Sequence, residues 1–203
     1  MLLQRVRESG ERDLGLRWRY FSLSQVNSHD EGWTIWGAVE DDPAARGRLA
    51  FGAAEAARRQ DRFEALHAAL LEGRHEHGLD LDDLKVVEGL AADAALDMTR
   101  FRADLADPSI LEPLARDHLA AVSNLGVFGT PTFHLPSRGA AYVRVRPAPA
   151  GSGALELFDQ LLRIIGEEPY LLELKRPRKP AGVARPPTSS PAKTRCGPAS
   201  RLL

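Results

Sequence analysis

The spacing of the apolar residues switches from a helical to a strand period at about Gly126, and this switch limits the folds that the chain can adopt. From Arg46 to about Asp107 the apolar residues recur at intervals of three and four, which is typical of amphipathic helices. Residues Ser109–Asn124 continue the pattern, and one helical face carries Leu111, Leu114, His118, Val122 and Leu125. Beyond Gly126 the period becomes that of strands. We therefore predict a block of helices followed by a short sheet.

The sheet predicted after Gly126 is an antiparallel hairpin. Thr132–Leu135 has the composition of a strand, Pro136–Gly139 of a turn, and Ala140–Val145 of the partner strand. A last helix is expected over Gly153–Ile165, where apolar residues again recur at helical spacing.

The first part of the chain is predicted to contain a helix and a strand. A helix over residues 2–8 ends at Ser9-Gly10, and Gly126 is a second expected helix stop. Leu14–Phe21 alternates apolar with mostly polar residues, which indicates a strand with one buried face. The predicted order is helix, strand, helical block, helix, strand, strand, helix, so the fold class is α/β.

Cysteine usage limits the chemistry of the chain. Cys196 is the only cysteine among 203 residues, which excludes an intrachain disulfide and a redox-active cysteine pair. It lies in a Pro-rich, basic stretch, residues 176–203, which we predict to be a disordered tail. We interpret Cys196 as an incidental thiol, because a reactive one needs a fixed cationic or helix-terminal neighbour.

Charge and hydropathy indicate the compartment and the partners. The net charge of −1 gives no global reason to expect a nucleic acid or an anionic membrane as partner. The chain has no apolar run long enough to span a bilayer, and charged residues follow Met1-Leu2-Leu3 too early for a secretory signal. We expect a cytoplasmic protein with neither kind of partner.

Several histidines and tryptophans are candidate site residues. His75-Glu76-His77 lies near acidic residues, but we expect a solvated helix end there and no metal site. His67 and His118 lie on apolar helical faces and are expected to be core or groove-lining residues. The pair Trp33 and Trp36 is expected to pack where the helical block meets the sheet.

Three segments resemble a known family. The segment from Gly126 to Phe133, Gly-Val-Phe-Gly-Thr-Pro-Thr-Phe, resembles the Gly-Val-x-Gly-x-Pro-Thr-Phe segment of DsbA-family proteins in the thioredoxin superfamily. Pro169–Arg176 is similar to the closing Pro-x-x-x-Glu-Leu-Lys-Arg of actinobacterial DsbA-like proteins, including mycothiol-dependent oxidoreductases. Arg17–Leu23 resembles their second strand and the loop after it.

The resemblance implies a thioredoxin-like fold with an inserted all-helical domain and with the first β-strand absent. Residues 1–36 and 124–175 would form the incomplete thioredoxin-like part, and residues 37–123 the insertion. It also implies a cis bond before Pro131, with Phe133 in the core and the backbone of Thr130 facing a surface groove. Thr130 and Pro131 would then bind substrate, because an extended peptide can pair there as an added strand.

The same resemblance implies an activity and, at the same time, a missing site. Family members place Cys-Pro-x-Cys at the start of the first helix, where the helix terminus lowers the pKa of the first thiol. Here Met1 falls beyond that position, so we assign no catalytic residue and expect a truncated, inactive thiol–disulfide oxidoreductase. No cofactor is expected, although an intact family member could use a low-molecular-weight thiol.

Two alternatives remain open at this point. Kappa-type glutathione transferases and 2-hydroxychromene-2-carboxylate isomerases share the fold, but they use a thiol cofactor with a Ser or a single Cys at the position absent here. A non-catalytic peptide-binding module is the other alternative. The expected partners are protein or small-molecule thiols and disulfides, and the sequence predicts no particular oligomeric state.

Overall fold

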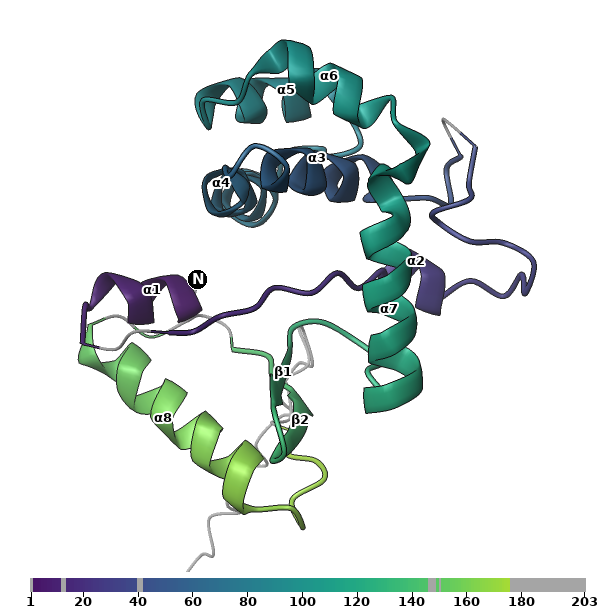
Figure 1. The fold of residues 1–203 in the computed structure, drawn as a ribbon. Helices are drawn as coiled ribbons and strands as arrows, with labels where there is room; N and C mark the ends of the chain where they lie inside the picture. The colour runs from purple at the N-terminus through teal and green to yellow at the C-terminus, as the bar shows by residue number, and fades with distance from the viewer. Residues whose placement is uncertain (1, 12–13, 40–41, 146–148, 150, 176–203) are drawn as a thin grey trace, which may run out of the picture. The chain divides into compact units, whose positions relative to one another are not determined.

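A computed structural model describes residues 2–11, 14–39, 42–145, 149 and 151–175 (Figure 1). The chain divides into two units, Met1–Pro169 and Tyr170–Leu203. The predicted tail and Cys196 lie outside the described residues. No helix in the described part of the chain is long and apolar enough to cross a membrane.

The first unit is mainly helical, with one hairpin near its end (Figure 1). A short 3-10 helix, η1, precedes α7. In chain order the elements are α1 (Leu2–Glu8), α2 (Leu23–Val26), α3 (Arg48–Arg58), α4 (Phe63–His75), α5 (Leu84–Asp93), α6 (Met98–Leu105), η1 (Pro108–Leu111), α7 (Glu112–Leu125), β1 (Thr132–Leu135), β2 (Gly139–Tyr142) and α8 (Ser152–Glu167).

Side chains at the helix ends explain where several helices begin and stop. The Asp83 carboxylate accepts a hydrogen bond from the Lys85 backbone at the start of α5, and Asp97 accepts two such bonds at the start of α6. Gly126 follows α7 with a φ of 61°, in the left-handed region that glycine adopts without a Cβ clash. The helix stop predicted at Gly126 is therefore confirmed.

The single helix predicted over Ser109–Asn124 is instead η1 followed by α7. Asp107 accepts a hydrogen bond from the Ser109 backbone and so caps the 3-10 turn. Pro113 has no backbone N–H to donate, so it is best accommodated in the first turn of an α-helix, where the N–H groups have no acceptor within the helix. The α-helix therefore starts afresh at Glu112, with Pro113 in its first turn.

The helical block is centred on the small residues of α3. Ala53, Ala54, Ala56 and Ala57 are buried, and their size lets neighbouring helices approach closely. Larger buried side chains come from the surrounding helices, among them Leu66, Val87 and Phe101. Burial of each of these side chains away from water stabilises the folded state by about 1.5–3 kcal/mol. The apolar faces that the spacing predicts for these helices are therefore buried in a common core.

The strand predicted over Leu14–Phe21 is absent, because no neighbouring strand pairs with it among the described residues. The alternation on which the prediction rested is nevertheless present. Leu14, Leu16 and Trp18 are half-buried, whereas the residues between them are exposed. The segment has the side-chain pattern of a strand without the ladder of backbone hydrogen bonds that defines one.

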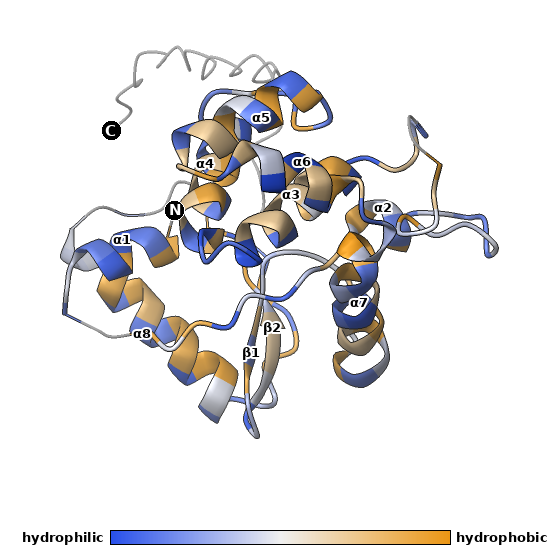
Figure 2. Ribbon diagram, turned by 45° about the horizontal axis from the view of Figure 1, so that its top comes forward, coloured by the Kyte–Doolittle hydropathy of each residue, from blue (hydrophilic) through white to orange (hydrophobic). Residues whose placement is uncertain are grey.

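The hairpin and α8 form a second, smaller core together with α1. Strands β1 and β2 pair antiparallel, with Thr132 opposite Tyr142, so β2 is displaced towards the turn from its predicted range. Phe133 packs edge-on against Phe158 of α8, with ring centroids 6.4 Å apart. Figure 2 shows hydrophobic and hydrophilic bands along α8, as expected for an amphipathic helix. The buried members of this core are Leu2, Val6, Ala154 and Phe158.

Candidate functional site

The loop that joins α7 to β1 contains the predicted substrate-binding residues. The Thr130–Pro131 peptide bond is cis, and both residues are exposed. The Pro131 carbonyl accepts a hydrogen bond of 3.0 Å from the Val143 backbone, which extends the β1–β2 pairing by one step. Gly129 is buried, and its carbonyl accepts a 2.7 Å hydrogen bond from the Thr132 hydroxyl. The loop is thus fixed on both sides of Thr130.

Thr130 itself has unused hydrogen-bonding capacity. Among the described residues, nothing bonds to its backbone N–H, its carbonyl or its hydroxyl. Burying any of these groups without a hydrogen-bond partner would destabilise the fold, and in the exposed loop water can serve as that partner. An exposed N–H and carbonyl on an anchored loop can pair with the backbone of another chain.

An aromatic surface adjoins this loop. Phe128 is 68% exposed, and its ring contacts that of Tyr142 on β2, with centroids 5.5 Å apart. Tyr142 is itself 40% exposed. Phe128, two residues before Thr130, and Tyr142, opposite Thr132 in the hairpin, therefore both remain in contact with water.

The apolar face of α7 continues this surface. Its first half is buried, through Leu114 and His118, as the helical pattern predicts. Its last two turns are not covered, because Val122 and Leu125 are each 41% exposed. Leu119 adjoins them on the helix and is 53% exposed. We call Leu119, Val122, Leu125 and Phe128 the α7 apolar surface.

His118 marks the point where the buried half of α7 ends. Its Nδ1 accepts a 3.2 Å hydrogen bond from the Ser22 backbone, and its ring lies against Phe21 and Trp36. Burial lowers the pKa of His118, because the charged imidazolium is poorly solvated there. The predicted core or groove-lining role of His118 is therefore confirmed as a core role.

The other three histidines considered in the sequence, His67, His75 and His77, lie outside this loop and surface. His67 on α4 lies between Trp18 and Phe63, with ring centroids 4.4 and 5.0 Å away, and burial lowers its pKa. His75 and His77 are exposed, and His77 contacts Glu72 at 3.4 Å. No group of three metal-ligating side chains occurs within the described ranges.

The two tryptophans flagged by the sequence pack against the helical core. Trp33 and Trp36 are both partly buried there. Trp33 also donates a 2.7 Å hydrogen bond from Nε1 to Asp42, and this bond holds the pKa of Asp42 below its usual range. The expectation that they serve packing agrees with these contacts.

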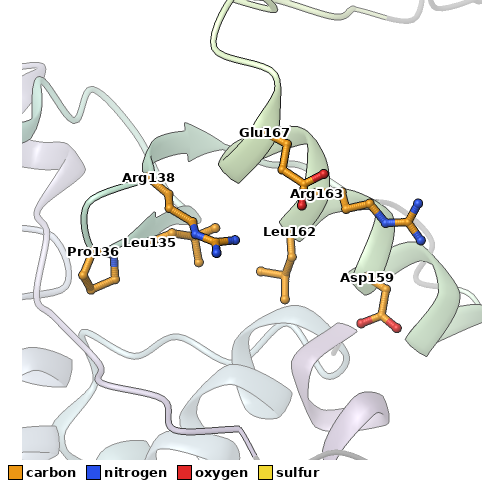
Figure 3. Close-up of a pocket in the computed structure, with 7 residues that line it drawn as sticks. All are labelled: Leu135, Pro136, Arg138, Asp159, Leu162, Arg163 and Glu167. Atoms are coloured by element: carbon orange, nitrogen blue, oxygen red, sulfur yellow. The ribbon is translucent and has the colours of Figure 1, made fainter.

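A cleft of about 530 Å³ lies between the hairpin turn and α8 (Figure 3). Arg138 reaches into it from the turn, whereas Leu162, Arg163 and Glu167 come from α8. Asp159 also lines it, so two arginines face two carboxylates. With balanced charges and an open rim, the cleft selects no particular ion.

Two parts of the site were not predicted from the sequence. The helix α2 has only four residues, too few for a periodic signal, and it is capped by the preceding Ser22, whose hydroxyl accepts a hydrogen bond from the Gln25 backbone N–H. The sequence also did not predict that the α7 apolar surface is exposed. The spacing of apolar residues identifies the apolar face of a helix, but it does not show which other residues cover that face.

The fold and the loop together define a class of protein, namely a domain of mixed helices and sheet in which strand β1 follows a loop with a cis proline. Residues 39–162, more than half of the chain, match the model of the DSBA-like thioredoxin domain. The chain therefore belongs to the DSBA-like thioredoxin family, whose members are related to thiol–disulfide oxidoreductases. No curated protein matches the chain.

Proposed function

We propose that the Thr130–Pro131 loop and the α7 apolar surface bind an extended, apolar polypeptide segment. The proposal makes this chain the polypeptide-binding part of a DsbA-type thiol–disulfide oxidoreductase system. The observation that carries it is the combination, on neighbouring residues, of unpaired backbone groups at Thr130 and uncovered apolar side chains on α7.

The backbone of Thr130 supplies the orientation. A strand added beside it would satisfy its N–H and carbonyl, and main-chain pairing of this kind is independent of the partner's sequence. The neighbouring backbone is already used, because the Pro131 carbonyl bonds to Val143 and the Thr132 hydroxyl to Gly129. An incoming chain would therefore be directed to Thr130.

The α7 apolar surface supplies the preference for substrate. Val122, Leu125 and Phe128 carry no charge, so a segment with apolar side chains would bury area here without stranding an ion. Such segments are exposed in unfolded proteins and buried in folded ones. The preferred partner is therefore an unfolded protein, with a thiol or disulfide as the expected reactive group.

Thiol exchange by this chain alone is not part of the proposal. Catalytic exchange uses one thiolate to attack and a second thiol to resolve the mixed disulfide. The 203 residues include one cysteine, Cys196, which lies outside the described residues. We therefore propose binding without dithiol turnover for the chain as given.

The test is a binding titration with a fluorescently labelled insulin B chain, reduced and carboxymethylated so that it is unfolded and cannot exchange. We expect the fluorescence anisotropy to saturate with the unaltered chain. The substitution Leu125→Ser together with Phe128→Ser should weaken binding by about tenfold or more, since each removes a large buried side chain from the complex.

The matched control is Leu84→Ser on α5, a leucine that is 50% exposed in a different part of the unit. This variant should bind the labelled peptide as the unaltered chain does. Equal weakening by both changes, or no binding by the unaltered chain, would exclude the proposed site.

A further inference from the structure

The second unit begins with a short run of exposed apolar side chains. Tyr170 is 93% exposed, Leu172 is 92% exposed and Leu174 is 75% exposed. Leu171 is 46% exposed, and no other stretch of five described residues leaves four large apolar side chains in water. A run of this kind is typical of a surface that meets a partner.

The backbone of this run is free to pair with another chain. Residues 170–174 belong to no helix or strand, and their N–H and carbonyl groups bond to no other described residue. In an extended chain alternate side chains share one side, so Tyr170, Leu172 and Leu174 would form one apolar face. Glu173 and Lys175 would lie on the opposite face, and their ion pair leaves residues 170–175 without net charge.

We propose that the Tyr170–Leu174 segment of one copy binds to Thr130 and the α7 apolar surface of a second copy. This inference rests on the proposed function and names a partner for that site, the chain itself. The segment has the two properties that the site selects, an unpaired backbone and apolar side chains. Its backbone would pair with that of Thr130, while its apolar face would cover α7.

The lengths of the two surfaces agree. An extended chain rises about 3.3 Å per residue, so Tyr170 and Leu174 would lie about 13 Å apart. A helix rises about 1.5 Å per residue, which places Leu119 and Leu125 about 9 Å apart along the axis of α7. Phe128 continues the surface beyond the end of the helix. Three alternate side chains of the segment can therefore cover the whole α7 apolar surface at once.

The exchange is reciprocal and therefore closes at two copies. Each copy carries one segment and one site, so a two-fold arrangement uses both segments and both sites. Contacts between so few side chains make a small interface, of the kind found in transient complexes. Dimer formation then regulates the site, because an unfolded polypeptide binds by displacing the segment of the second copy.

The test is sedimentation equilibrium of the full 203-residue chain over a wide range of concentrations. We expect a reversible equilibrium between monomer and dimer. Replacing Tyr170, Leu172 and Leu174 together by Ser should raise the dimer dissociation constant about tenfold or more, because the apolar face is lost. Leu171→Ser is the matched control, since Leu171 would face away from α7, and it should change that constant by less than about twofold.

A labelled synthetic peptide of residues 170–175 separates the roles of segment and site. The triple Ser variant keeps its site, so it should bind this peptide as the unaltered chain does. The variant with Leu125→Ser and Phe128→Ser lacks the site, so it should lose dimerisation and also bind the peptide about tenfold more weakly.

Three results would overturn the inference. The unaltered chain could sediment as a monomer at every concentration, or Leu171→Ser could weaken dimerisation as much as the triple variant does. The third is an insulin B chain bound at the α7 apolar surface that the 170–175 peptide does not displace. In all three cases the proposed function stands as long as the insulin B chain binds, and only loss of that binding would exclude it.

Discussion

The backbone N–H of Ser22 donates a hydrogen bond to Nδ1 of His118, and both residues are buried. Ser22 precedes α2, whereas His118 lies 96 residues later on α7. The bond therefore fixes the start of α2 to the middle of α7, where the buried half of that helix ends. Since Nδ1 accepts this bond, it must carry no proton, and the bond depends on a neutral imidazole.

The stability of the fold should consequently fall in mild acid. Burial lowers the pKa of His118 and of His67 in the folded chain. Above the ordinary histidine pKa of about 6.5 both are neutral in either state, and their full contribution to stability is present. As the pH falls below that value, the unfolded chain takes up protons that the folded chain resists, so stability is lost.

Urea unfolding at a series of pH values measures this effect. We expect the unfolding free energy to drop by about 1–2 kcal/mol between about pH 7.5 and pH 5.5. Asp107, whose pKa is lowered to about 2 by hydrogen bonds from Ser109, remains ionised in this range and does not contribute. His118→Leu should reduce the pH dependence and His75→Gln, at an exposed position, should not. An unchanged slope in His118→Leu would contradict the assignment.

The end of α5 offers a stabilising substitution. Ala95 has a φ of 57°, and the Leu96 and Ala95 backbones donate to the Ala91 and Ala92 carbonyls, as at a helix end closed by a left-handed residue. A Cβ is costly in this conformation, so Ala95→Gly should raise the unfolding free energy by about 0.5–1 kcal/mol.

Thermal unfolding of two neighbouring variants tests that reasoning. Ala94 has a φ of −79°, which suits any residue, so Ala94→Gly should lower the melting temperature while Ala95→Gly raises it. A fall in both would show that the conformation of Ala95 carries no penalty.

The 203-residue chain should not catalyse disulfide reduction. Turbidity of insulin in the presence of dithiothreitol follows the separation of its chains, and a lone thiol has no second cysteine in the chain to resolve a mixed disulfide. We expect the rate to equal that of a Cys196→Ser variant. A clearly faster rate for the unaltered chain would show that Cys196 takes part in turnover.

Local signals in the sequence predicted much of the fold. Gly126 acts within a few residues of itself, so the helix end that it determines was predicted correctly. The prediction of a strand over Leu14–Phe21 was wrong because a strand also needs a second strand to pair with. Such pairing depends on residues far away in the sequence and is not a local property. The break before Glu112 was missed because apolar spacing is nearly the same in η1 and in α7.

The sequence predicted where the candidate site lies, but it did not predict which neighbouring side chains are exposed around it. The Gly-Thr-Pro-Thr segment located Thr130 and Pro131 by resemblance alone. The apolar pattern of α7 joins Leu114 and Val122 on one face without distinguishing them, although the first is 1% exposed and the second 41%. Which side chains remain uncovered depends on distant residues such as Phe21 and Trp36, which pack beside His118.

Binding of a polypeptide along Thr130 and the α7 apolar surface can be observed residue by residue. The measurement follows the backbone amide resonances of the 15N-labelled chain as carboxymethylated insulin B chain is added. We predict the largest shifts at Thr130, Phe128 and Leu125, with slower solvent exchange of the Thr130 N–H as it gains a hydrogen-bond partner. Unchanged resonances at these positions, with shifts centred instead around Leu84 on α5, would contradict it.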